Sequence, residues 1–148
     1  MVKIGINGFG RIGRLVARSI VERNDKNLQL VAINDLADTK TNAHLFKYDS
    51  VHGRFNGEVK VVSEDTISIN GNEVKVFKKT DPAEIPWGSL GIEVVVESTG
   101  LFTVKKDGVN KKGKVVKRCR KSHYKRRSEK SYYLRSCRRR RYYYCNGC

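Results

Sequence analysis

Residues 2–14 read VKIGINGFGRIGR, and this stretch decides the fold. Residues 2–7 form a β-rich run, and Gly8, Gly10 and Gly13 follow at once with the spacing G-x-G-x-x-G. The spacing alone is a weak signal, because glycines this dense also occur in ordinary turns. It becomes informative where a strand precedes it and a helix follows it.

A helix is predicted directly after the glycines, because apolar residues recur there at helical spacing. Three charged residues, Arg14, Arg18 and Glu22, are expected on its other faces, and Asn24 ends it. The apolar positions are Ile12, Leu15, Val16, Ile20 and Val21.

A second apolar run, residues 28–34 (LQLVAIN), is too short for a typical helix and ends at Asp35. Strand, glycine turn, helix, strand and acid together make one β-α-β unit of about 34 residues. We therefore predict an α/β fold with a Rossmann-type, doubly wound and mostly parallel sheet.

The residues that follow continue this pattern. A helix is predicted over 39–48, a loop over 49–57, and strands over 59–62, 66–69, 74–77 and 92–96, the last buried on both faces. The sequence Asn70-Gly71-Asn72 indicates a hairpin turn. His44 and His52 are interpreted as surface or packing residues and Trp87 as a loop anchor.

The glycine motif has a direct chemical interpretation as a phosphate-binding turn. Gly8 permits the tight turn, Gly10 lets a pyrophosphate approach the backbone, and Gly13 lets the helix pack closely on the strand. The N–H groups of Arg11 and Ile12 would face the phosphates at the positive end of the helix.

Two further positions complete the candidate dinucleotide site. Asp35 would accept hydrogen bonds from the adenosine ribose and repel a 2′-phosphate, which favours NAD over NADP. The alternative is that Asp35 is only a turn residue at the end of a strand. Ser98, Thr99 and Gly100 follow a buried strand, where cofactor contacts gather in such sheets; the alternative is a plain strand-to-helix turn.

Five motifs in order resemble the glyceraldehyde-3-phosphate dehydrogenase family. They are GINGFGRIGR (5–14), Asn34-Asp35, FKYDSVHGRF (46–55), the loop from Asp81-Pro82 to Trp87, and VVVESTGLFT (94–103). The resemblance covers residues 1–103. It implies the NAD-binding domain of a homotetrameric, glycolytic oxidoreductase that acts on an aldehyde with NAD as acceptor.

The resemblance also implies residue roles. The backbone near Thr80 would lie beside the adenine, although the family usually has Arg at this position, and Phe102 would follow the cofactor groove. The cofactor-binding residues implied are Asn7, Gly8, Gly10, Arg11, Ile12, Gly13, Asp35, Thr80, Ser98, Thr99 and Gly100.

The family's catalytic residues have no counterpart in the 148 residues. In the family the nucleophilic Cys lies in a Ser-Cys-Thr-Thr-Asn motif and its base is a His of the second domain, and neither is present. We therefore expect this chain to bind NAD but to be inactive alone, with no catalytic residue and no catalytic domain. We expect a monomer or an aggregate rather than the family's tetramer.

Charge divides the chain at about residue 103. Residues 1–103 contain equal numbers of basic and acidic residues, so residues 104–148 carry the whole net charge of +16, all four Cys and six of the seven Tyr. No apolar run long enough for a membrane span and no signal peptide are visible, so we expect a cytoplasmic protein without membrane or metal partners.

Three interpretations of residues 104–148 compete. Interleaved Arg and Tyr favour a nucleic-acid-binding tail. Cys145-x-x-Cys148 with Cys119, His123 or Cys137 could bind zinc, although the spacings do not form two knuckles. A reading-frame error explains more: back-translated and read one base later, 130–137 yields Lys-Val-Ile-Ile-Ser-Ala-Pro-Ala and 138–148 yields an acidic stretch followed by Ile-Val-Met-Gly-Val, which match the family in order.

We favour the frameshift interpretation, with the break near residues 108–117. Such a tail is expected to be disordered, because its charge cannot be offset by burial, and to bind polyanions without specificity. The family strand after Gly100 would then be missing, leaving the sheet incomplete and open at that edge.

Overall fold

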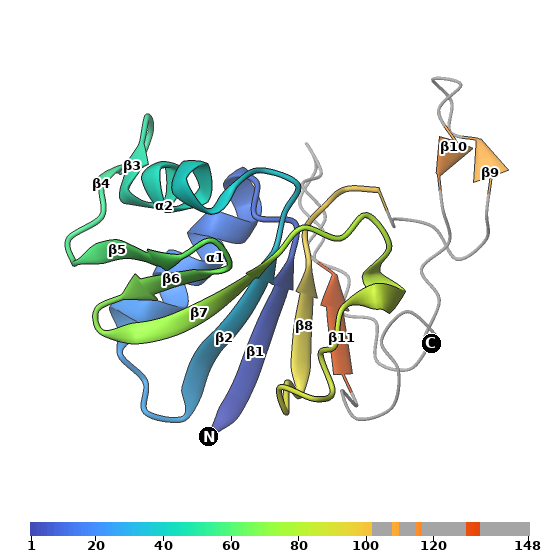
Figure 1. The fold of residues 1–148 in the computed structure, drawn as a ribbon, viewed down its shortest axis with the longest axis horizontal. Helices are drawn as coiled ribbons and strands as arrows, with labels where there is room; N and C mark the ends of the chain where they lie inside the picture. Colours follow the sequence, from blue (N-terminus) through green and yellow to red (C-terminus); the bar gives the residue numbers. More distant parts are fainter. Residues whose placement is uncertain (102–107, 110–114, 117–129, 134–148) are drawn as a thin grey trace.

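The computed structural model describes residues 1–101, 108–109, 115–116 and 130–133 (Figure 1). The first β-α-β unit is present as predicted: β1 (Val2–Asn7), α1 (Arg11–Arg23) and β2 (Leu28–Asn34). Asn24 adopts a left-handed conformation at the C-cap of α1, which ends the helix where the sequence indicated.

The second half of the sheet begins with α2 (Thr39–Lys47), whose N-cap Asp38 accepts a hydrogen bond from Thr41 N at 2.7 Å. A two-residue ladder joins β3 (Tyr48–Asp49) to β4 (Gly53–Arg54). It begins at Tyr48, the last residue of the predicted helix, and otherwise lies within the segment predicted as loop. Antiparallel strands β5 (Val59–Ser63), β6 (Thr66–Ile69) and β7 (Asn72–Phe77) follow. Asn70 and Gly71 both have positive φ, as the predicted hairpin turn requires.

The chain then crosses over through η1 (Pro82–Glu84) to β8 (Val94–Glu97), which begins two residues later than predicted. Three short strands lie beyond residue 103: β9 (Gly108–Val109), β10 (Val115–Val116) and β11 (Lys130–Tyr133). The remainder of residues 104–148 lies outside the described residues.

The seven-stranded sheet has the order β11-β8-β1-β2-β7-β6-β5. The strands β11, β8, β1, β2 and β7 run parallel to one another, and β6 and β5 continue the sheet beyond β7 in antiparallel pairing. This is the doubly wound order 3-2-1-4-5 without a sixth parallel strand among the described residues. The predicted fold class, a mostly parallel Rossmann-type sheet that is incomplete at one edge, is confirmed.

The sheet lacks a sixth parallel strand among the described residues, but the expectation that the edge at β8 is open is wrong. Lys130 to Tyr133 form β11, which runs parallel to β8 with Lys130 opposite Val94 and Tyr133 opposite Glu97. Backbone N–H and C=O groups of an edge strand take any partner of suitable geometry, so this pairing does not require the family's residues.

Two clusters of buried apolar side chains lie on the two faces of the sheet. The larger one packs α1 and α2 on one face, and Figure 1 shows α1 behind the sheet. The smaller one lies on the other face, where Trp87 and Ile92 of the crossover cover Ala32 and Val95. Trp87 is buried, as expected of a loop anchor. No helix among the described residues is long and apolar enough to cross a membrane.

Candidate functional site

The candidate site lies at the carboxyl ends of the parallel strands. The last residues of these strands stand in register: Asn7 opposite Asn34 and Glu97, and Asn34 opposite Phe77. Figure 1 shows β1 and β8 pointing to this end of the sheet, with the turn into α1 directly beyond β1. Ligands of doubly wound sheets bind at this end, beside the first strand.

Gly8 makes the turn from β1 to α1 in a conformation that other residues rarely adopt. Its φ is +91°, and a Cβ on it would lie 2.5 Å from the backbone N of Thr99. A Cβ on Gly13 would lie 2.1 Å from the carbonyl oxygen of Gly8. Both glycines are therefore required by packing within the chain itself, which agrees with their predicted geometric roles.

Gly10 differs from these two because no described part of the chain requires it. Among the described residues, a Cβ at Gly10 would meet no atom within 4 Å. Gly10 is also the N-cap of α1, and no side chain caps this helix end. The first-turn amides of Arg11 and Ile12 therefore have no side-chain cap among the residues that the structure describes, the arrangement that binds anions at helix N-termini.

Asp35 ties the end of β2 to the glycine turn. Its Oδ2 accepts a hydrogen bond from Phe9 N at 2.8 Å, and its Oδ1 accepts one from Ala37 N at 3.0 Å. The hydrogen bond from Ala37 N, two residues along the chain, is typical of a turn residue and agrees with the alternative role of Asp35 at the end of a strand. A carboxylate has about four acceptor sites, so both contacts leave capacity for ribose hydroxyls.

The turn after β8 packs against the glycine turn. Ser98 Oγ lies 2.6 Å from the Gly8 carbonyl oxygen and 3.1 Å from that of Asn7, and both oxygens can accept its proton. Ser98 N also donates to the carbonyl oxygen of Asn7 at 2.8 Å. Gly100 has a φ of +72°, which turns the chain away from the sheet. Ser98 therefore holds the two turns together.

Three buried polar side chains join the ends of the strands. Asn34 Nδ2 donates to Asn7 Oδ1 at 2.8 Å, and Asn7 Nδ2 donates to Glu97 Oε2 at 2.7 Å. Each of the three residues exposes 4% of its surface or less. Sequence reasoning placed Asn7 at the site but missed the roles of Asn34 and Glu97, because their partners lie up to 90 residues away along the chain.

The outer ends of this chain of hydrogen bonds are backbone groups. Lys79 N donates to Asn34 Oδ1 at 2.8 Å, and Asn34 Nδ2 donates to Lys79 O at 2.9 Å. At the other end Thr99 N donates to Glu97 Oε1 at 2.8 Å, and the Thr99 hydroxyl donates to the same oxygen. The predicted site residue Thr80 is exposed and follows Lys79 directly. Phe102 and all tail Cys and His lie outside the described residues.

Arg18 is not on an outer face of α1, as its sequence position suggested, but is buried. Its guanidinium donates to the carbonyl oxygens of Phe46 and Gly53 and stands over the rings of Phe46 and Phe55. These carbonyl groups, contributed by other segments, satisfy the buried charge. Arg18 therefore fastens α1 to α2 and to β4.

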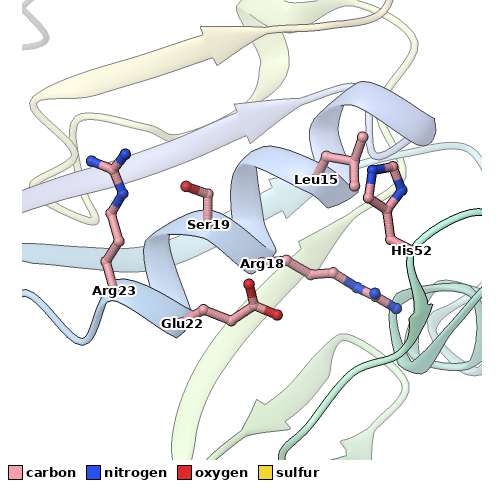
Figure 2. Close-up of a pocket in the computed structure, with 6 residues that line it drawn as sticks. All are labelled: Leu15, Arg18, Ser19, Glu22, Arg23 and His52. Atoms are coloured by element: carbon pink, nitrogen blue, oxygen red, sulfur yellow. The ribbon is translucent and has the colours of Figure 1, made fainter.

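A hollow of about 540 Å³ lies over the same part of α1, away from the ends of the strands (Figure 2). His52 reaches it from the loop between β3 and β4. That loop is organised by Asp49, whose pKa is lowered to about 2, mainly by the backbone hydrogen bonds from His52 and Val51. His44 packs against Tyr48 with ring centroids 5.0 Å apart and ring planes tilted by 44°. His44 is thus a packing residue, and His52 lines the surface hollow.

Residues 2–105 match the model of the family described as glyceraldehyde 3-phosphate dehydrogenase, NAD binding domain. The chain is 55% identical over 118 residues to glyceraldehyde-3-phosphate dehydrogenase 1 of Bacillus cereus, covering 80% of this chain and 34% of that protein. It is 61% identical over 105 residues to glyceraldehyde-3-phosphate dehydrogenase of Clostridium acetobutylicum, covering 71% of this chain and 30% of that protein. The chain thus spans about a third of the length of the curated relatives it matches.

Proposed function

The chain belongs to the glyceraldehyde-3-phosphate dehydrogenase family through its NAD-binding domain, and on this premise we propose where NAD binds. The proposed site is the edge formed by the glycine turn, Asp35 and the turn after β8. The observation that carries it is the room at Gly10, where a Cβ would meet no atom of the described residues, next to a helix N-terminus that no side chain of these residues caps.

The residues present fit a pyrophosphate at this position. The absent Cβ of Gly10 leaves room for phosphate oxygens close to the backbone, and the amides of Arg11 and Ile12 would donate to them. Gly8 and Gly13 build the turn that presents these amides, and Asn7 holds the end of β1 beneath it. Ser98 locks the turn from the other side.

The two ends of the dinucleotide follow from this placement. Asp35 lies at the end of β2, where its free acceptor sites would take the adenosine ribose hydroxyls, and the backbone at Thr80 would lie beside the adenine. Thr99 and Gly100 would line the path toward the nicotinamide. A 2′-phosphate on the ribose would face the carboxylate of Asp35, which favours NAD over NADP.

Isothermal titration of the 148-residue chain with NAD and with NADP tests this placement. The unchanged chain should bind NAD more tightly, and Asp35→Ala should weaken NAD binding about tenfold and narrow the gap to NADP. Asp38→Ala is the matched control: it removes a nearby carboxylate that caps α2 and faces no proposed ligand atom. Equal affinity of the unchanged chain for NAD and NADP would contradict the assignment.

We further propose that the activity of the whole protein is oxidation of glyceraldehyde 3-phosphate with NAD, which accepts a hydride when bound. The reaction needs a thiolate held beside the cofactor and a base, and the 148 residues lack the family's Ser-Cys-Thr-Thr-Asn motif. The purified chain should therefore form no NADH from aldehyde, NAD and phosphate. A turnover that depends on Cys119 would contradict this.

We propose that residues 104–148 arise from translation out of frame and have no role in the dehydrogenase. Sequencing the gene is the direct test, and a one-base-shifted frame that does not encode the family's next strand would overturn the proposal. The 18 basic residues of this segment should still bind duplex DNA without sequence preference, with affinity that collapses between about 50 and 200 mM salt.

A further inference from the structure

We propose that Glu97 is a positioning residue for the cofactor groove. The side chains of Glu97, Asn7 and Asn34, here called the buried relay, link two rims of the groove. One is the β7 rim, residues 79–80, and the other is the β8 rim, residues 98–100. The buried relay keeps these two rims at a fixed separation. This role rests on the proposed placement of NAD between the rims.

The donors and acceptors of the buried relay can be arranged in only one order. A backbone N–H only donates and a backbone C=O only accepts, so the two bonds to Lys79 fix which end of the Asn34 amide carries the oxygen. Asn34 Nδ2 then has to meet the oxygen of Asn7, and Asn7 Nδ2 has to meet an acceptor. The carboxylate of Glu97, which is an acceptor only, completes the series.

The β8 rim imposes the same requirement from its own side. Thr99 presents two donors, its N–H and its hydroxyl, to one oxygen of Glu97. Both carboxylate oxygens of Glu97 are thus needed as acceptors, one for each rim. No neutral side chain of this shape supplies two acceptor oxygens.

The Glu97→Gln substitution tests whether both side-chain oxygens at position 97 must be acceptors. The new side-chain carbonyl would stay with the two donors of Thr99, so the new NH₂ group would face Asn7 Nδ2, donor against donor. If Asn7 turns over to relieve the conflict, its NH₂ group faces Asn34 Nδ2, and turning Asn34 moves the conflict to Lys79. A change at the β8 rim is therefore transmitted to the β7 rim, because each buried donor needs an acceptor.

A second substitution should restore the relay. With Asn7→Asp added to Glu97→Gln, the carboxylate introduced in β1 accepts from both the amide introduced in β8 and Asn34 Nδ2. The carbonyl oxygen of that introduced amide accepts from Thr99. The hydrogen bonds named here among Asn34, position 7, position 97 and Thr99 are all kept, and the total charge equals that of the unchanged chain. Asn7→Asp alone instead brings two carboxylates to hydrogen-bonding distance, which is unfavourable.

The experiment uses the full 148-residue chain in five forms: unchanged, Glu97→Gln, Asn7→Asp, the double variant, and Val74→Ala. Val74 is buried in β7 away from the relay, so its truncation lowers the Tm without touching a rim. We would measure the Tm, the Kd for NAD by titration calorimetry, and the amide chemical shifts of Lys79 and Thr99 by NMR. The amide shifts report the relay without any ligand.

Each single relay variant should raise the Kd for NAD about tenfold, because binding must restore a rim that the conflict has displaced. The double variant should return the Kd to within about threefold of the unchanged chain, and Val74→Ala should leave it unchanged. In Glu97→Gln the Lys79 amide should shift, although it lies on the other rim, and the double variant should restore it.

Three results would overturn the proposal. The double variant could bind NAD no better than the weaker single variant, the Lys79 amide could stay unmoved in Glu97→Gln, or Val74→Ala could raise the Kd as much as Glu97→Gln does. Failure of the unchanged chain to bind NAD is a different result. It would contradict the proposed function and the role of Glu97 in binding, while the Lys79 shift would still decide whether the rims are coupled.

Discussion

The strand ends around Asn7 and the β5–β6 hairpin belong to one sheet, but different interactions hold them in place. At the strand ends, Asn7, Asn34 and Glu97 are buried and joined by hydrogen bonds of fixed direction. In the hairpin, Ile67 and Ile69 are buried while β5 is largely exposed. Apolar contacts have no direction, so the hairpin tolerates replacement of one apolar residue by another of similar size. The hydrogen-bonded side chains at the strand ends do not tolerate such replacement. We expect substitutions at the strand ends to alter ligand binding, and substitutions in the hairpin to alter stability alone.

The largest effect is expected at Gly8. Gly8→Ala combines a positive φ with a clash against the backbone of Thr99, and should lower the free energy of unfolding by about 4 kcal/mol. Gly71→Ala in the turn between β6 and β7 is the matched control, because its φ of +82° is similar but no atom of the described residues lies within 4 Å of its Cβ. This substitution should lower the free energy of unfolding by only about 1–2 kcal/mol. Urea unfolding of both variants measures the difference, and equal losses would remove the distinction between the two turns.

Ile67→Ala tests the hairpin side of the comparison. Ile67 is fully buried in β6, so the truncation should lower the free energy of unfolding by about 3 kcal/mol. The Kd for NAD, measured where the variant is still folded, should stay unchanged. A Kd that rises as it does for Asp35→Ala would show that the hairpin also shapes the ligand site.

Local patterns in the sequence predicted the elements that local interactions build. The glycine spacing and the helical period after it indicated β1, α1 and β2, and Asn70-Gly71 indicated the hairpin between β6 and β7. The β3–β4 ladder was missed, because two residues per strand leave no period to detect. The strand β11 was missed because its pairing depends on a free edge rather than on its own sequence.

The candidate site was predictable only in part for the same reason. The glycines and Asp35 lie within one β-α-β unit, so their spacing indicates their roles. The burial of Arg18 and the relay through Asn34 and Glu97 depend on contacts 27 to 90 residues apart, which periodicity does not register.

A smaller effect is expected at Asp49, which organises the loop between β3 and β4. Its pKa falls from 3.8 to about 2 on folding, through backbone hydrogen bonds from His52 and Val51. A lowered pKa stabilises the folded chain above about pH 4, and the contribution is lost as the pH falls through about 2. Thermal unfolding from pH 5 to pH 2 should therefore show the Tm difference between the unchanged chain and Asp49→Ala shrink across this range. Asp49→Asn, which keeps a neutral acceptor, should show a Tm with less pH dependence than the unchanged chain, and a constant difference down to pH 2 would contradict the assignment.

Gly10→Ala should have the smallest effect on stability and tests the proposed NAD site most directly. The new Cβ meets no atom within 4 Å in the described part of the chain, so the free energy of unfolding should change by less than about 1 kcal/mol. It would occupy the space proposed for the pyrophosphate, so the Kd for NAD should rise at least about tenfold. Titration calorimetry beside a thermal melt gives both numbers from one preparation. An unchanged melt with a lost or weakened NAD isotherm is the predicted result, and an unchanged isotherm would place NAD elsewhere.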